Sequence, residues 1–250
     1  MAQIKTESEI DKIQKACRAA ADILGELGKA VRVGITTAEI NDIADDLFKA
    51  KGVIPAFKGY RGYKYGTCLS VNEEVVHGLP GNRQLKDGDI IGIDVGAIVD
   101  GYYGDNAETF PVGKVSAKVK RLLSTTRSAL YKGIAQASDG KHLGDVSSAI
   151  EEEAVKNGFS VVKNLYGHGV GSALHEDPLI PNFGKKGTGL VLKAGMTIAI
   201  EPMLNVGGSD IRTLDDGWTI VTEDGSLSAH FEHTILVTKG VPKILTRRDQ

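Results

Sequence analysis

Two aspartates interrupt a pair of apolar, strand-like segments near the middle of this 250-residue chain. Residues 90–99 and 102–112 are rich in isoleucine, valine, tyrosine and phenylalanine, and an Asp-Gly dipeptide that is typical of tight turns joins them. Asp94 lies in the first segment, flanked by isoleucine and valine, and Asp105 lies in the second. The pattern predicts an antiparallel hairpin with carboxylates in its interior.

Two registers of this hairpin are possible. A turn centred between Val99 and Asp100 pairs Asp94 directly with Asp105, whereas a turn at Asp100-Gly101 makes them diagonal neighbours. Both registers leave the two carboxylates on one sheet face, because side chains alternate along a strand. Like charges on an apolar face are costly unless a cation neutralises them, so we expect a metal site; the alternative is that one or both face solvent near the turn.

Further candidate ligands interrupt apolar segments later in the chain. His168 lies between glycines in LYGHGVGSALHEDP, Glu201 ends the run MTIAIEPM, and Glu232 begins the run EHTILVT. Each could be an ordinary surface or core residue, but together with the aspartates they supply four carboxylates and one imidazole. Such a set suits Mn, Fe, Co or Zn, and two such ions can activate a water for hydrolysis of an amide or ester.

The order of the predicted elements repeats. Helix-like periodicity covers residues 7–33 and 36–52, and it returns over 116–137 and in a following helix that ends near residue 158. Strand-like runs follow each pair of helices, the later ones at 160–165, 189–192, 196–203, 217–221 and 230–238. We expect an α+β fold in a single catalytic domain over residues 1–250. Its two similar halves, about 1–112 and 113–250, would each pack helices on a curved antiparallel sheet, with a site in the cleft between them.

Composition narrows the class of protein. The chain has 30 lysines and arginines against 32 acidic residues, which argues against a large basic surface for nucleic acid or an anionic membrane. No apolar run approaches the roughly 20 residues of a membrane span, and the N-terminus lacks a signal-peptide core. The two cysteines, Cys17 and Cys68, cannot form a disulfide framework. We expect a soluble, cytoplasmic protein.

Several strings in the chain, taken together, resemble one family over essentially the whole length. They are VNEEVVHGLP, IDVG, DGYYGD, GHGVG, HEDP, IEPM, DDGWT and FEHTI. The family is the type I methionine aminopeptidases, which have the pita-bread fold. The resemblance implies metal-dependent removal of the initiator methionine from nascent polypeptides when the second residue is small.

The resemblance also implies roles for the five candidate ligands. Asp94 would chelate one of two divalent ions, Asp105 and Glu232 would bridge both, and His168 and Glu201 would complete the other. A metal-bridged water would attack the scissile carbonyl, with Glu201 as general acid and base.

Substrate-binding residues follow from the same resemblance. His77 would contact the N-terminal region of the substrate and shuttle protons, and His175 would hydrogen-bond the scissile carbonyl. The chain departs from the family at Leu174, where phenylalanine is frequent, and this departure bears on the shape of the methionine pocket. The residues implied for that pocket are Tyr60, Tyr63, Cys68 and Trp218.

Relatives of the family leave two alternatives. Prolidases and aminopeptidase P share the catalytic half but carry an extra N-terminal domain that we do not expect here. Type II methionine aminopeptidases carry a long insertion, and the interval from Glu201 to Glu232 is too short to contain it. The alternatives are an X-Pro-cleaving enzyme and a metal-free binding protein of the same fold. The resemblance favours a monomer that meets nascent chains at the ribosome.

Overall fold

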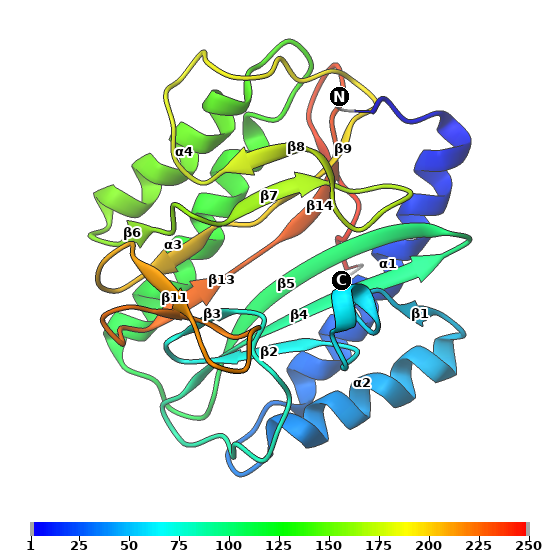
Figure 1. The fold of residues 1–250 in the computed structure, drawn as a ribbon. Helices are drawn as coiled ribbons and strands as arrows, with labels where there is room; N and C mark the ends of the chain where they lie inside the picture. Colours follow the sequence, from blue (N-terminus) through cyan, green and yellow to red (C-terminus); the bar gives the residue numbers. More distant parts are fainter. Residues whose placement is uncertain (1–2, 249–250) are drawn as a thin grey trace.

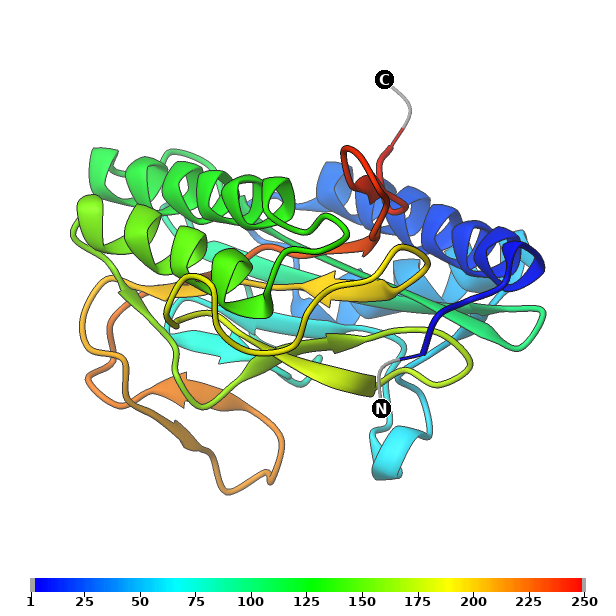
Figure 2. The ribbon, with the colours of Figure 1, turned by 90° about the horizontal axis from the view of Figure 1, so that it is seen from above.

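Two pairs of helices lie along one face of the protein, and the strands form the layer beneath them (Figures 1 and 2). The computed structural model describes residues 3–248. The helices are α1 (Glu7–Ala30) and α2 (Thr37–Lys51), then α3 (Ala117–Ala135) and α4 (Leu143–Lys156). All four expected helices are therefore present, and no helix within residues 3–248 is long and apolar enough to cross a membrane.

Local sequence determines where the first two helices begin. The Thr6 side chain accepts a hydrogen bond from the Glu9 amide while the Glu9 carboxylate accepts one from the Thr6 amide, and Thr36 and Glu39 repeat this capping box at α2. Each box satisfies backbone N–H groups that the first helical turn leaves unpaired.

The central hairpin consists of β4 (Ile90–Val99) and β5 (Tyr102–Pro111). Val99 pairs with Tyr102, so the turn is Asp100-Gly101 and Asp94 lies opposite Ala107, which makes Asp105 its diagonal neighbour. The second of the two registers is therefore the correct one. Asp100 and Gly101 both adopt positive φ angles, 51° and 78°, as a two-residue turn between twisted strands requires.

The first half packs α1 closely on this hairpin. A Cβ atom at Gly104 of β5 would lie 2.3 Å from the backbone nitrogen of Cys17, so the approach of helix and strand requires glycine there. Short strands β1 (Ile54–Pro55) and β2 (Cys68–Val71) flank β4. Ile23, Leu24 and Leu27 of α1 share a buried core with Ile91 and Ile93 of β4.

The second half places β9 (Thr197–Ile200) between β14 (His233–Leu236) and β7 (Tyr166–Gly169). Strand β8 (Glu176–Pro181) extends this sheet beyond β7, and β15 (Lys243–Ile244) extends it beyond β14. The expected strand at 189–192 is wrong, because within it the structure has only an isolated bridge between Val191 and His142.

Smaller sheets complete the layer. Strand β10 (Met203–Asn205) lies between β13 (Ser228–His230) and β6 (Ser160–Val161), and β12 (Ile220–Thr222) lies between β11 (Ile211–Thr213) and β3 (Glu74–Val76). The β11–β12 hairpin and the 3-10 helix η1 (Tyr60–Gly62) project from the face opposite the helices (Figure 2).

Two expected strands, 196–203 and 230–238, are each broken in two. The first breaks at Glu201 and Pro202, and the second breaks at Phe231 and Glu232. Proline lacks the N–H that a continuous ladder needs. At the break the Glu232 amide donates to the carbonyl of Ala107 at 2.8 Å, which joins the second half to β5 of the first. The interruptions therefore bring both glutamates to the junction between the halves.

Candidate metal centre and active site

The five candidate ligands line one cavity of about 400 Å³. Asp105, His168 and Glu232 each present one ligand atom, and these three atoms lie within 4.8 Å of one another. Oε1 of Glu201 lies 3.4 Å from Nε2 of His168, and Asp94 extends from β4 beside Asp105. The junction thus gathers carboxylates from β4, β5 and the two strand breaks around one imidazole from β7.

A backbone contact orients the imidazole of His168. Nδ1 lies 2.9 Å from the carbonyl oxygen of Gly169, which assigns its proton to Nδ1 and leaves Nε2 to face the carboxylates. Burial lowers the pKa of His168 to about 4. The ring is therefore neutral at physiological pH, which is the form that binds a metal ion.

The carboxylates of the cluster have raised pKa values, as expected for buried like charges at a site that binds a cation. Burial raises the pKa of Asp105 to about 7, and burial together with Asp105 and Glu201 raises the pKa of Asp94 well above its ordinary value. The same causes raise the pKa of Glu232. Within the described residues, Asp94 Oδ1 and Glu232 Oε1 are buried without a hydrogen-bond partner. Unpartnered buried oxygens beside like charges fit one or two divalent cations.

His230 also lines the cavity, although it is not among the residues predicted from the sequence. Its Nε2 lies 3.7 Å from Oε2 of Glu201 and is buried without a hydrogen-bond partner among the described residues. Thr109 Oγ1 bonds both the backbone N–H and the carbonyl of His230, which holds the residue against β5. The alternation of side chains along a strand could have indicated His230 from the sequence. It stands two residues before Glu232, and residues two apart lie on the same side of an extended chain.

The two other histidines that the resemblance selected also line the cavity. His77 follows β3 with a φ of 59°, a conformation that non-glycine residues rarely adopt and that is found at functional sites. The ring of His175 lies 4.2 Å from that of His168, centroid to centroid, and its Nδ1 lies 2.9 Å from the Tyr60 hydroxyl. The Tyr60 contact leaves Nε2 of His175 as the nitrogen available to a bound molecule.

An aromatic and thiol-lined wall adjoins the carboxylates. Tyr63 and Trp218 meet edge to face at 5.0 Å between ring centroids, and the Tyr63 hydroxyl lies 3.0 Å from the carbonyl of Thr67. Leu174 is 2% exposed and packs in this cluster. All four residues expected in the methionine pocket belong to this wall: Tyr60, Tyr63, Cys68 and Trp218.

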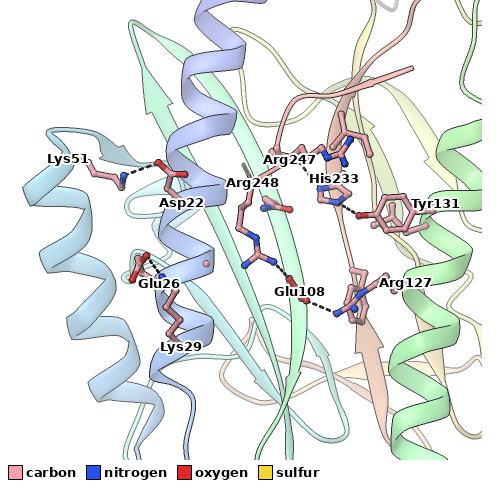
Figure 3. Close-up of a pocket in the computed structure, with 16 residues that line it drawn as sticks. Asp22, Glu26, Lys29, Lys51, Glu108, Arg127, Tyr131, His233, Arg247 and Arg248 are labelled. Atoms are coloured by element: carbon pink, nitrogen blue, oxygen red, sulfur yellow. Dashed lines mark hydrogen bonds and ion pairs between the residues drawn. The ribbon is translucent and has the colours of Figure 1, made fainter. Parts of the chain in front are cut away.

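A second cavity, of about 980 Å³, lies on the helix face between α1 and α3 (Figure 3). Several of its charged side chains are paired with one another, as where Glu108 accepts from Arg127 at 2.7 Å and from Arg248 at 2.6 Å. Asp22 and Lys51 form another such pair, at 2.9 Å. The predicted site residues line the cavity of about 400 Å³ instead. The candidate active site therefore lies on the opposite face of β5 and β14 from this second cavity.

Comparison with known proteins identifies similar chains. Residues 11–239 match the family described as metallopeptidase family M24. Methionine aminopeptidase 1 of Bacillus subtilis is 50% identical over 243 residues, which cover 97% of this chain and 98% of that protein. A methionine aminopeptidase of Clostridium perfringens is 46% identical with the same coverage.

Solved structures agree in fold. The crystal structure of methionine aminopeptidase from Thermotoga maritima is 51% identical, with a TM-score of 0.97, and covers 99% of this chain and 100% of that chain. The prolidase of Pyrococcus furiosus is 25% identical, with a TM-score of 0.80, and this chain spans 66% of its length. The expected pita-bread fold, with helices packed on antiparallel sheet in two similar halves, is thereby confirmed.

Proposed function

Because this chain belongs to metallopeptidase family M24, we propose that it is a methionine aminopeptidase that removes the initiator methionine when the second residue is small. The observation that carries the proposal is one cavity shared by the five-ligand cluster, two further histidines and an aromatic wall. Its substrates are the N-termini of nascent polypeptides, met at the ribosome by a cytoplasmic monomer.

The ligand cluster would hold two divalent ions, among Co, Mn, Fe and Zn. When bound, these ions would lower the pKa of a water and polarise the scissile carbonyl. Four carboxylates offset the charge of two divalent ions, and the Gly169 carbonyl keeps His168 in the tautomer that presents Nε2. The five residues are Asp94, Asp105, His168, Glu201 and Glu232.

The remaining polar groups act on the substrate and on protons. Glu201 accepts a proton from the attacking water and returns it to the leaving amine, because its carboxylate faces the cavity between two imidazoles. His175 donates from Nε2 to the oxygen that gains charge as the carbonyl becomes tetrahedral, and Tyr60 fixes its ring. His77 contacts the substrate beside its free amino group.

The wall formed by Tyr63, Cys68 and Trp218 selects the methionine side chain. Aromatic faces and a buried thiol make favourable contacts with a polarizable thioether, and the wall excludes water from it. Binding there places the scissile bond beside the carboxylates.

A peptide assay tests the proposal. Metal-depleted protein reconstituted with Co, Mn or Fe should cleave Met-Ala-Ser but neither Met-Lys-Ser nor an X-Pro peptide. Cleavage confined to the X-Pro peptide would favour a prolidase-like activity. Protein that binds no metal and cleaves none of the three peptides would exclude an enzyme and favour a binding protein.

A further inference from the structure

A buried ion pair links the N-terminal segment to the first residue of β8. Nζ of Lys5 lies 2.5 Å from Oε2 of Glu176, and the two side chains are only 2% and 9% exposed. Nζ also donates to the Gln3 side chain at 2.9 Å. Removing one partner from a buried pair leaves an uncompensated charge, in contrast to most surface pairs.

The other oxygen of Glu176 holds the loop before β8. Oε1 accepts from the Ser172 hydroxyl and from the Ala173 amide, each at 3.2 Å. A Cβ atom at Gly171 would lie 2.4 Å from Nζ of Lys5 and 2.6 Å from Oε1 of Glu176. The backbone of residues 171–173 therefore packs directly on the ion pair.

This loop carries two cavity residues. Leu174 and His175 both line the site, and His175 immediately precedes Glu176. The amide of Tyr103 in β5 donates to the carbonyl of Gly171 at 2.9 Å, so the loop also touches the first half. His175 is therefore the cavity residue nearest in the chain to Glu176, whose backbone pairs with Gly169 of β7.

Lys5 is held in place independently of the loop. Its amide donates to the carbonyl of Gly195 at 2.8 Å, and Thr6 next to it caps α1. The segment before α1 passes close to the β7–β8 connection in Figure 2, where the ion pair of Lys5 and Glu176 joins them. A fixed cation thus meets the carboxylate of Glu176, which accepts hydrogen bonds from Ser172 and Ala173 of the loop.

We propose that Lys5 is a positioning residue for His175, acting through Glu176 and the loop of residues 170–175. The inference rests on the proposed function, because the role of His175 in catalysis is part of it. Without the cation, the buried Glu176 carboxylate turns toward solvent and releases Ser172 and Ala173. His168 keeps its own contacts with Gly169 and β9, so metal binding is spared.

Kinetics and hydrogen exchange on the metal-loaded, full-length protein test this proposal. The variants are Lys5→Met, Lys5→Arg, Glu176→Gln and the double variant of Lys5→Met with Glu176→Gln. The matched control is Lys29→Met, which breaks an exposed pair with Glu26 on α1. Each protein is measured for kcat and KM on Met-Ala-Ser, for metal content, and for amide exchange of residues 170–176.

We expect Lys5→Met to lower kcat by about tenfold or more, since small misplacements of a catalytic group have effects of this size. Its KM and metal content should change less, and exchange of residues 170–176 should rise. Lys5→Arg, which keeps the charge, should stay within about threefold of the wild type. The double variant should recover part of the lost kcat, because a glutamine at 176 still accepts from Ser172 and Ala173 without needing a cation.

Wild-type kcat and unchanged exchange in Lys5→Met would overturn the proposal, as would a lower melting temperature with no change in kcat. If wild-type protein cleaves no peptide, the proposed function fails, and the exchange of residues 170–176 alone decides whether Lys5 orders the loop. If Lys5→Met does not fold, Lys5→Arg and the double variant of Lys5→Met with Glu176→Gln decide. Amide exchange of residues 170–176 above the wild-type level in both of these variants would contradict the mechanism.

Discussion

Nε2 of His230 lies 3.7 Å from Oε2 of Glu201, and Nε2 of His168 lies 3.4 Å from the other oxygen, Oε1. Glu201 is thus flanked by two imidazoles, each facing one of its oxygens. His168 belongs to the ligand cluster, whereas His230 is fixed to β5 through Thr109. The arrangement makes His230 a candidate to orient the proton-transferring carboxylate.

Replacing His230 by leucine should lower kcat on Met-Ala-Ser by about tenfold, because Oε2 of Glu201 loses the imidazole nitrogen that lies 3.7 Å from it. His230→Gln, whose amide can donate at similar reach, should recover most of that loss. His233→Gln is the matched control, since His233 lines the helix-face cavity (Figure 3). Equal kcat values for the leucine variant and the wild type would show that His230 does not orient Glu201 during catalysis.

Asp105→Asn should reduce metal occupancy and lower turnover by at least about a hundredfold, because the amide replaces an anionic oxygen of the ligand cluster. Elemental analysis after dialysis and steady-state kinetics measure the two effects. Glu108→Gln changes a carboxylate on the other face of the same strand and should leave metal content unchanged. Wild-type turnover at normal metal content in Asp105→Asn would contradict its assignment as a ligand.

The same substitution should stabilise the metal-free protein at alkaline pH. Burial raises the pKa of Asp105 to about 7, against about 3.9 in an unfolded chain. The folded state therefore holds a proton that the unfolded state has lost, so this carboxyl's stabilising contribution is full below about pH 4 and is lost as pH rises through 7.

Asparagine lacks this dependence, and it also removes the Asp105 charge that helps to raise the pKa values of Asp94, Glu201 and Glu232, an effect in the same direction. The melting temperature of metal-free Asp105→Asn relative to wild type should thus rise between pH 5 and pH 8 by several degrees, since 1 kcal/mol corresponds to about 2–4 °C for a chain of this size. Melting curves in chelator at each pH measure it. A constant difference across this range would show that Asp105 is ionised throughout.

Trp218→Leu should lower kcat/KM for Met-Ala-Ser by roughly tenfold to a hundredfold, mainly through KM, because the change removes an aromatic face from the pocket wall and its contact with Tyr63. Tyr131→Leu, a substitution of an exposed aromatic residue on the helix face, is the control. Peptide kinetics separate the two parameters, and a loss confined to kcat would argue that Trp218 does not contact the methionine side chain.

His175→Ala should lower kcat with metal content unchanged, because its proposed hydrogen bond forms as the carbonyl gains charge. Tyr60→Phe should reproduce a smaller part of this loss, since it removes the hydroxyl 2.9 Å from Nδ1 and only frees the ring. Kinetics and elemental analysis are run on both. Metal loss in His175→Ala, or an effect on KM alone, is incompatible with this role.

Sequence patterns were sufficient where the physics is local. Helical periodicity predicted the helices, and the structure shows why two of them begin where they do, because the capping boxes at Thr6 and Thr36 satisfy backbone groups within four residues. The register of the central hairpin was open until the positive φ angles of Asp100 and Gly101 distinguished the two possible turns. The strand predicted over 189–192 failed because its apolar residues lack a partner ladder.

The amino-acid sequence by itself determined which residues can carry the chemistry: carboxylates and histidines that break apolar strands are costly there unless they bind something. Their convergence was decided by the tertiary structure. Glu232 meets β5 through Ala107, and Lys5 meets Glu176 171 positions along the chain. His230 faces Glu201 for the same reason, because two strands break at one level. Such contacts depend on how the two halves pack, which the local periodicity of the sequence does not predict.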